Sequence, residues 1–173
     1  RLGKIDDGTT ISDYEPEEHK RAGSIQTSIV PCEWRKHKIN VVDTPGYADF
    51  RGEVISGIRI ADGAVIVVSA PSGVEVGSQQ MRHMADQMAL PRLIFVNKMD
   101  RVGADFMNVV KMIRERLGAN AHPLQIPLGE GELYTGLIDL IRQIEIVYND
   151  ESLGSEWTEG PVPDALVDQV AEL

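Results

Sequence analysis

The sequence predicts an α/β fold in which a mostly parallel sheet is flanked by helices. Short β-branched apolar runs have the length of buried strands: residues 39–42, 64–68 and 93–96. Amphipathic segments with helical spacing lie between and after these runs: residues 50–61, 76–90 and 104–117. Strands that alternate with helices of this length are joined by right-handed crossovers, so they run parallel. Ligands bind to such sheets at the carboxyl ends of the strands.

The first part of the chain precedes this alternation. Residues 1–20 are polar and have no apolar periodicity, so we expect them to form a loop. Residues 24–34 alternate partly, as a strand does, and Pro31 favours an edge position or a bulge. The basic stretch at residues 35–38 is expected to be the solvated turn of a hairpin that returns through residues 38–42, and the alternative is a docking patch on a ribonucleoprotein.

Apolar spacing also predicts which side of each later element is buried. The side chains expected to face inward are Phe50, Val54, Ile58 and Ile60 in the first helix, Met81, Met84, Met88 and Leu90 in the second, and Phe106, Val109, Val110, Ile113 and Leu117 in the third. Pro91 ends the second helix and Gly118 the third. The runs at residues 64–68 and 93–96 have no polar alternation, so we expect both of their faces to be buried.

Beyond residue 120 the pattern changes, and we place a domain boundary there. Residues 1–120 are predicted to form one partial domain and residues 121–173 part of a second. The elements expected in the second part are a strand at residues 122–126, a segment of mixed signals at 132–148, an acidic loop at 149–163 and the start of a helix at 164–173.

Composition narrows the classes of function. The chain has 173 residues and is 42% hydrophobic, which is enough for a real core. No apolar run approaches the ~20 residues that a membrane helix needs, so no membrane partner is expected. The single cysteine, Cys32, excludes an internal disulfide and fits a reducing, cytoplasmic compartment. The net charge of −10 opposes nonspecific nucleic-acid binding, and we expect no sequence-specific DNA binding.

A tetrapeptide at the end of the last apolar run has the chemistry of a base-reading site. Asn97, Lys98, Met99 and Asp100 follow residues 93–96 directly. The Asp100 carboxylate can accept both hydrogens that guanine presents at N1 and its 2-amino group, and adenine offers no such pair. The Lys98 stem can lie over the purine, and the Asn97 amide can join the base edge to backbone. Read alone, the tetrapeptide also fits a loop in which Asp caps the next helix.

A second motif follows the strand at residues 39–42. Asp43 stands where P-loop NTPases place an acidic residue that helps to hold Mg²⁺. Thr44 and Pro45 complete the turn, and Gly46 has no Cβ to keep the terminal phosphate away. Thr-Pro-Gly is also ordinary turn chemistry. The two motifs in this order, each at a strand end, favour a guanine-nucleotide site over two unrelated turns.

With these residues in view, the chain resembles the GTP-binding domain of the translation elongation factor G family. The resembling segments are residues 4–13, 37–46, 62–65, 73–75, 97–100, 103–105 and 115–119, and residues 136–140 are similar to the start of an insertion in that domain. The resemblance implies a P-loop GTPase fold that binds GTP or GDP with Mg²⁺. It implies nucleotide contacts from Asp43, Thr44, Pro45, Gly46, Asn97, Lys98 and Asp100, and metal contacts from Ser24 and Asp43.

The chain departs from the family pattern in three places. No Gly-x-x-x-x-Gly-Lys-Ser/Thr phosphate loop occurs in it, so we expect this chain to be a piece of a longer protein and to be inactive alone. We also expect its sheet to lack the first central strand, which would leave Val41, Val65 and Phe95 facing an exposed edge. Ser24 stands where the family has a metal-binding Thr. Tyr47 stands where the family has a His that orients the attacking water, so Tyr47 and Gly46 are the catalytic candidates, and slower or differently triggered hydrolysis is expected.

The resemblance therefore predicts a ribosome-associated translational GTPase that hydrolyses GTP to GDP and phosphate to switch conformation. The alternative is a nucleotide-binding elongation factor G-like module with weak or no hydrolysis, acting in ribosome protection or recycling. The expected partners are GTP and the ribosome.

Overall fold

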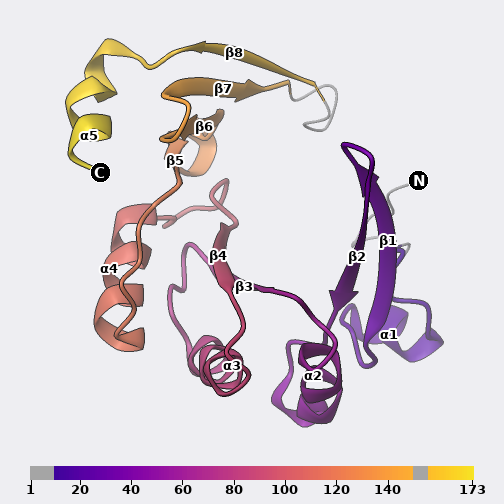
Figure 1. Cartoon of the computed structure of the whole chain (residues 1–173). Helices are drawn as coiled ribbons and strands as arrows, with labels where there is room; N and C mark the ends of the chain where they lie inside the picture. The colour runs from indigo at the N-terminus through magenta and orange to yellow at the C-terminus, as the bar shows by residue number, and fades with distance from the viewer. Residues whose placement is uncertain (1–9, 150–155) are drawn as a thin grey trace. The chain divides into compact units, whose positions relative to one another are not determined.

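The computed structural model describes residues 10–149 and 156–173. Its contacts divide the chain into two compact units. The first comprises Arg1–Val65 and Gln80–Leu93, and the second comprises Ile66–Gln79 and Ile94–Leu173. Each unit is described by itself (Figure 1).

The first unit contains a short helix, a hairpin and a second helix. Helix α1 spans Pro16–Arg21, and strands β1 (Ser28–Trp34) and β2 (His37–Asp43) pair antiparallel without a bulge. A 3₁₀ turn, η1 (Ala48–Phe50), leads into helix α2 (Arg51–Ile58). The backbone N–H of Thr27 donates to Glu53 Oε2 at 2.9 Å, which ties the start of the hairpin to α2.

Helix α1 corrects the expectation of a loop over residues 1–20, of which residues 1–9 lie outside the described part. The helix begins with Pro16 in its first turn, and a capping box joins Glu15 and Glu18. It ends at Ala22, whose φ of 50° is left-handed. Periodicity could not find this helix because it is too short to present an apolar stripe.

Strands β3 (Ala64–Ser69) and β4 (Arg92–Asn97) form the predicted parallel pair. The N–H of Ala64 donates to Pro91 O at 2.9 Å, and the N–H of Ala70 donates to Asn97 O at 2.8 Å. The sequence offset is the same at both ends, so the strands run in one direction. Helix α3 (Val76–Gln87) connects them.

One face of this strand pair is exposed in the described part of the chain. This agrees with the exposed edge expected at Val65 and Phe95 from the missing first strand, and it corrects the burial on both faces that the apolar runs alone predicted. Ile66 and Val68 of β3 are buried, whereas Val65 is 63% exposed and Phe95 of β4 is 56% exposed. Successive side chains of a strand point to opposite faces, and described residues cover only one of them.

The helices confirm most of the expected inward-facing residues. Helix α4 (Phe106–Leu117) is capped by Asp105, whose Oδ1 accepts the N–H of Asn108 at 2.8 Å, and it ends at Gly118 as predicted. Its buried residues are Val109, Val110, Ile113 and Leu117. Two expectations fail because the helices end early: Ile60 lies beyond α2 and Met88 beyond α3, and both side chains are exposed.

An antiparallel sheet follows α4 in the second unit. Its strands pair in chain order, and they are β5 (Gln125–Leu128), β6 (Gly136–Asp139), β7 (Ile144–Tyr148) and β8 (Trp157–Pro161). A turn, η2 (Gly131–Leu133), separates β5 from β6. Strand β8 corrects the acidic loop expected at residues 149–163, of which residues 150–155 lie outside the described part. The sequence of β8 is polar and contains Gly and Pro, so it gives no strand signal. It forms a strand because β7 supplies backbone hydrogen-bond partners.

The chain ends in the predicted helix, which comprises η4 (Asp164–Leu166) and α5 (Val167–Glu172). No helix in the described ranges is long and apolar enough to cross a membrane.

Candidate nucleotide-binding site

The base-reading candidates lie in the loop that leaves β4, in the second unit. The Met99 side chain is 7% exposed and packs in a cluster with Ala70 and Ala104, whereas its neighbours Lys98 and Asp100 are exposed. The loop is therefore fastened by one apolar side chain and presents polar ones to solvent.

Backbone hydrogen bonds fix the course of this loop. Lys98 has a φ of 63°, and its N–H donates to Asn97 Oδ1 at 2.8 Å. The short side chain of Asn97 therefore stabilises the left-handed conformation of Lys98 by accepting its backbone N–H. The carbonyl of Lys98 accepts the N–H of Arg101 at 3.2 Å, and that of Met99 accepts the N–H of Gly131 at 2.8 Å. Two segments of the second unit thus hold the tetrapeptide.

The Asp100 carboxylate is available to a ligand. It forms an ion pair with the exposed Arg101, with 3.5 Å from Arg101 Nε to Asp100 Oδ2. An exposed ion pair of this kind contributes little and is easily exchanged. Burial raises the pKa of nearby Tyr134, and the charges of Tyr148 and Asp100 raise it further, so Tyr134 stays a neutral phenol beside the loop.

The second motif lies in the first unit, where β2 ends at Asp43 opposite Ser28 of β1. Pro45 is buried, and Gly46 is exposed. Within the described part of the chain, a Cβ built on Gly46 would meet no atom within 4 Å. Packing among these residues therefore does not require glycine at this position.

Helix α2 approaches this motif closely through Gly57. A Cβ at Gly57 would lie 2.8 Å from Thr44 Cγ2, 3.2 Å from Val42 Cγ1 and 3.7 Å from Thr27 Cγ2. Because real Cβ atoms do not come this close, glycine lets α2 support the turn that carries Asp43 and Thr44. Sequence reasoning missed Gly57, although a glycine inside a helix is a recognisable signal.

The two residues that depart from the family pattern, Ser24 and Tyr47, lie in the same unit. The Tyr47 ring packs beside Gly23, with Tyr47 Cε2 3.2 Å from the position of a Cβ there. The Ser24 hydroxyl donates to Asp13 Oδ1 at 2.6 Å. The hydroxyl that the resemblance assigns to a metal is therefore held by a carboxylate that sequence reasoning did not single out.

Glu18 organises the segment that carries Ser24. Its side chain is 1% exposed and accepts four backbone N–H groups: Tyr14 at 3.1 Å, Glu15 at 3.0 Å, Ile25 at 2.8 Å and Gln26 at 3.0 Å. Burial opposes ionisation of Glu18, but these bonds outweigh it, and its pKa lies below the usual value. The only sequence signal was a second Glu three residues after Glu15, which indicates a capping box.

Oxygen ligands of the right kind for Mg²⁺ are present. Mg²⁺ takes hard oxygen donors and usually only one or two protein ligands, with phosphate and water completing its shell. Ser24 and Asp43 offer a hydroxyl and a carboxylate, and both belong to the first unit. The described residues contain no group of three or more His, Cys, Asp or Glu side chains that could hold a metal by themselves. These oxygens are of the chemical type that Mg²⁺ takes beside a phosphate.

The sequence matches the family described as the elongation factor Tu GTP binding domain over residues 2–167. A curated relative, "Elongation factor G 2" of Syntrophus aciditrophicus (strain SB), is 40% identical over 163 residues, which cover 94% of this chain and 24% of that protein. A crystal structure of a Thermus thermophilus protein superposes with a TM-score of 0.91 at 34% identity, covering 99% of this chain and 25% of that one. The likeness confirms the predicted fold class, and the chain spans about a quarter of each relative's length.

Proposed function

Because the chain belongs to the elongation factor Tu GTP-binding domain family, we propose that it is the guanine-nucleotide-binding part of a ribosome-associated translational GTPase. The observation that carries the proposal is the β4 loop, in which Met99 is buried while Asn97, Lys98 and Asp100 are exposed. A loop fastened in this way presents a carboxylate and an amide at a strand end, where α/β sheets bind ligands. The complete protein acts in the cytoplasm, with the ribosome and GTP as partners.

Each site residue has a role that its chemistry supports. Asp100 accepts the two hydrogens of the guanine edge, Lys98 lies over the ring, and Asn97 steadies the loop. A site built around such a pair rejects a base that lacks it by about 10⁴-fold or more. Asp43, Thr44 and Pro45 form the turn beside the phosphates, and Gly46 leaves room for the terminal one.

Ser24 and Asp43 are the residues that would hold Mg²⁺, which neutralises phosphate charge when it is bound. The Ser24 hydroxyl must turn from Asp13 to reach a metal, because it now donates to Asp13 Oδ1. Segments that nucleotide contacts order, and that hydrolysis releases, are the usual switch of such proteins. In this protein, the switch would exchange the hydrogen bond between Ser24 and Asp13 for a contact between Ser24 and the metal.

The similarity to elongation factors supports hydrolysis over the alternative, a nucleotide-binding module with weak or no hydrolysis. Two features bear on the rate of that hydrolysis: Tyr47 offers a phenol where an imidazole is expected, and Asp13 accepts the Ser24 hydroxyl. A phenol can hydrogen-bond a water, but its acid–base range is far from that of an imidazole, so it suits proton transfer poorly. Loss of one positioned catalytic group costs about 10²–10⁴-fold in rate.

Single-turnover hydrolysis distinguishes these functions. The complete protein that contains this chain is mixed with γ-labelled GTP, with and without ribosomes, and phosphate release is followed. We expect release that ribosomes accelerate, and a further gain in Tyr47→His. A stoichiometric GTP complex without phosphate release favours the binding module. Failure to bind guanine nucleotides or ribosomes contradicts both functions.

A further inference from the structure

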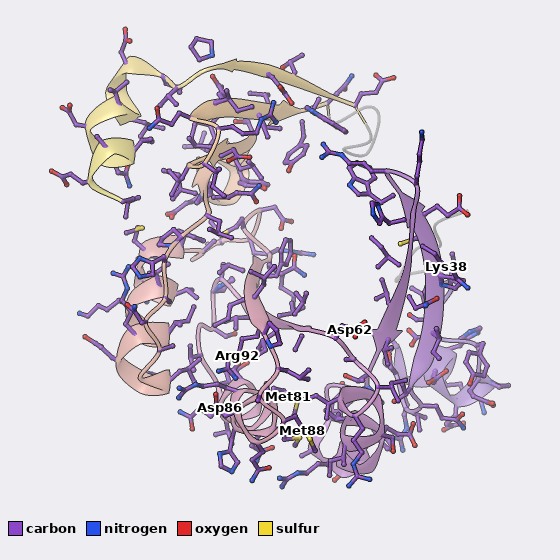
Figure 2. The ribbon with its side chains drawn as sticks, in the orientation of Figure 1. Lys38, Asp62, Met81, Asp86, Met88 and Arg92 are labelled. Atoms are coloured by element: carbon purple, nitrogen blue, oxygen red, sulfur yellow. The ribbon has the colours of Figure 1, made fainter. Side chains whose placement is uncertain are left out.

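The tip of the β1–β2 hairpin concentrates cations and an aromatic ring on one exposed feature. It comprises residues 34–38: Trp34, Arg35, Lys36, His37 and Lys38. All five are exposed, and the Trp34 side chain is 58% exposed. Lys38 lies on the hairpin and is exposed (Figure 2). We call these residues the hairpin tip.

The backbone of the hairpin tip is unusual for its sequence. Trp34 pairs with His37, so Arg35 and Lys36 are the two central turn residues, with φ of 47° and 67°. Two positive φ values in a two-residue hairpin turn mark type I′, which strongly prefers Asn-Gly. Each ordinary residue held left-handed costs roughly 1–2 kcal/mol. The turn therefore carries two long cations at positions where Asn and Gly would be more stable.

Neighbouring side chains give the hairpin tip a defined form. The Arg35 guanidinium lies over the Trp34 ring, 5.8 Å from its centroid, and so covers one face of the indole. His37 Nδ1 lies 3.0 Å from the carbonyl oxygen of Arg35, a contact in which the ring N–H donates. The exposed remainder of the indole can accept a second flat group, such as a base.

The local charge is opposite to that of the whole chain. The chain carries a net charge of −10, whereas the hairpin tip carries three cations and no carboxylate. The nearest acidic residue along the strands is Glu33, which pairs in register with Lys38. No ion pair within residues 10–149 and 156–173 involves Arg35, Lys36 or Lys38. A polyanion would thus meet cations that form no ion pair within these ranges.

We propose that the hairpin tip docks on RNA, with a base stacked on Trp34 and phosphates bound by Arg35, Lys36 and Lys38. The inference rests on the proposed ribosomal function and names RNA, rather than a ribosomal protein, as the component that this feature contacts. A cation set beside an open aromatic face is the combination that unpaired nucleotides use: the base stacks, and the backbone meets charge. An acidic protein surface would use the cations but has no need of the indole face.

The first test removes the charges while relaxing the turn. Arg35→Asn together with Lys36→Gly is made in the complete protein, and binding to ribosomes is measured with a non-hydrolysable GTP analogue over a range of salt. We expect binding to weaken by about 10-fold and the salt slope to fall by about 0.7 for each phosphate that the variant no longer binds. Thermal stability should stay the same or rise, because Asn-Gly suits the turn. The control variant, Arg59→Gln with Lys111→Gln, removes the same charge elsewhere. It should change neither the affinity for ribosomes nor the salt slope.

The second test identifies the molecule that the hairpin tip contacts. The photoreactive residue benzoylphenylalanine replaces Trp34, the protein is bound to ribosomes and irradiated, and the adduct is treated with ribonuclease or protease. A ribonuclease-sensitive adduct supports the proposal. A protein adduct, no adduct, or unchanged binding by the Asn-Gly variant overturns it while the GTPase assignment stands. If the unmodified protein does not bind ribosomes at all, the proposed function fails as well.

Discussion

Replacing Glu18 by Gln should loosen the segment that carries Ser24. The carboxylate accepts the N–H groups of Tyr14 and Glu15 with one oxygen and those of Ile25 and Gln26 with the other. A glutamine keeps the shape but has only one acceptor oxygen. Its NH₂ group would therefore face two backbone N–H donors and leave both without a partner.

The size of the effect follows from these bonds. A hydrogen bond to a charged group contributes about 1.5–3 kcal/mol, and a buried donor left unsatisfied costs about 1–3 kcal/mol. Losing two such bonds in a side chain that is almost fully buried should cost at least about 3 kcal/mol locally. That free energy corresponds to roughly a 100-fold change in the opening equilibrium.

Amide hydrogen exchange of the complete protein measures this opening directly. In Glu18→Gln, the pair of amides that faces the NH₂ group, either Tyr14 and Glu15 or Ile25 and Gln26, should exchange about 100-fold faster. Glu17→Gln is the matched control, because Glu17 is exposed and its ion pair with Lys20, 3.3 Å long, contributes about 0–1 kcal/mol. Equal exchange rates in the two variants would refute the role given to Glu18.

Three further predictions concern pH, the base-reading loop and α2. The folded-state pKa of Glu18 lies below the unfolded value of about 4.3. Its contribution to the free energy of unfolding is therefore complete above that pH and is lost as the pH falls through the folded pKa. The acid unfolding of Glu18→Gln should accordingly be less steep. Asp100→Asn should leave thermal stability unchanged but weaken GTP binding by orders of magnitude in titration calorimetry, and equal affinity would contradict its role. Gly57→Ala should destabilise by about 1–3 kcal/mol in thermal or urea unfolding by pushing on Thr44, whereas Gly52→Ala, with open space around it, should stabilise by up to about 1 kcal/mol. If both glycine variants gain stability, the close approach of α2 is not limiting.

The sequence was a good guide where a pattern is local and repeated. Helix α4 was predicted with its buried face, because its apolar residues recur at helical spacing and Gly118 marks its end. The two strand-end motifs were found because polar residues interrupt apolar runs abruptly. The apolar runs alone overestimated the burial of β3 and β4, because the sequence of a strand does not say what covers it. The absence of the first central strand correctly predicted the exposure of Val65 and Phe95.

Residues that act through distant backbone were beyond the reach of pattern reasoning. Glu18 bonds to amides seven and eight residues later, and no periodicity marks such a loop closure. The contact between Asp13 and Ser24 spans 11 residues and is equally invisible in the sequence. Strand β8 needed its partner β7 before its polar residues became a strand.

The burial of Met99 divides the Asn-Lys-x-Asp tetrapeptide into two kinds of position. Replacing Met99 by another flexible apolar side chain of similar volume should change the melting temperature. Substitutions at the flanking polar positions should change the nucleotide affinity. Adjacent residues of the tetrapeptide can therefore be studied with separate assays, one for thermal stability and one for nucleotide binding. A substitution at residue 99 can change the stability of the loop without changing its specificity for the base.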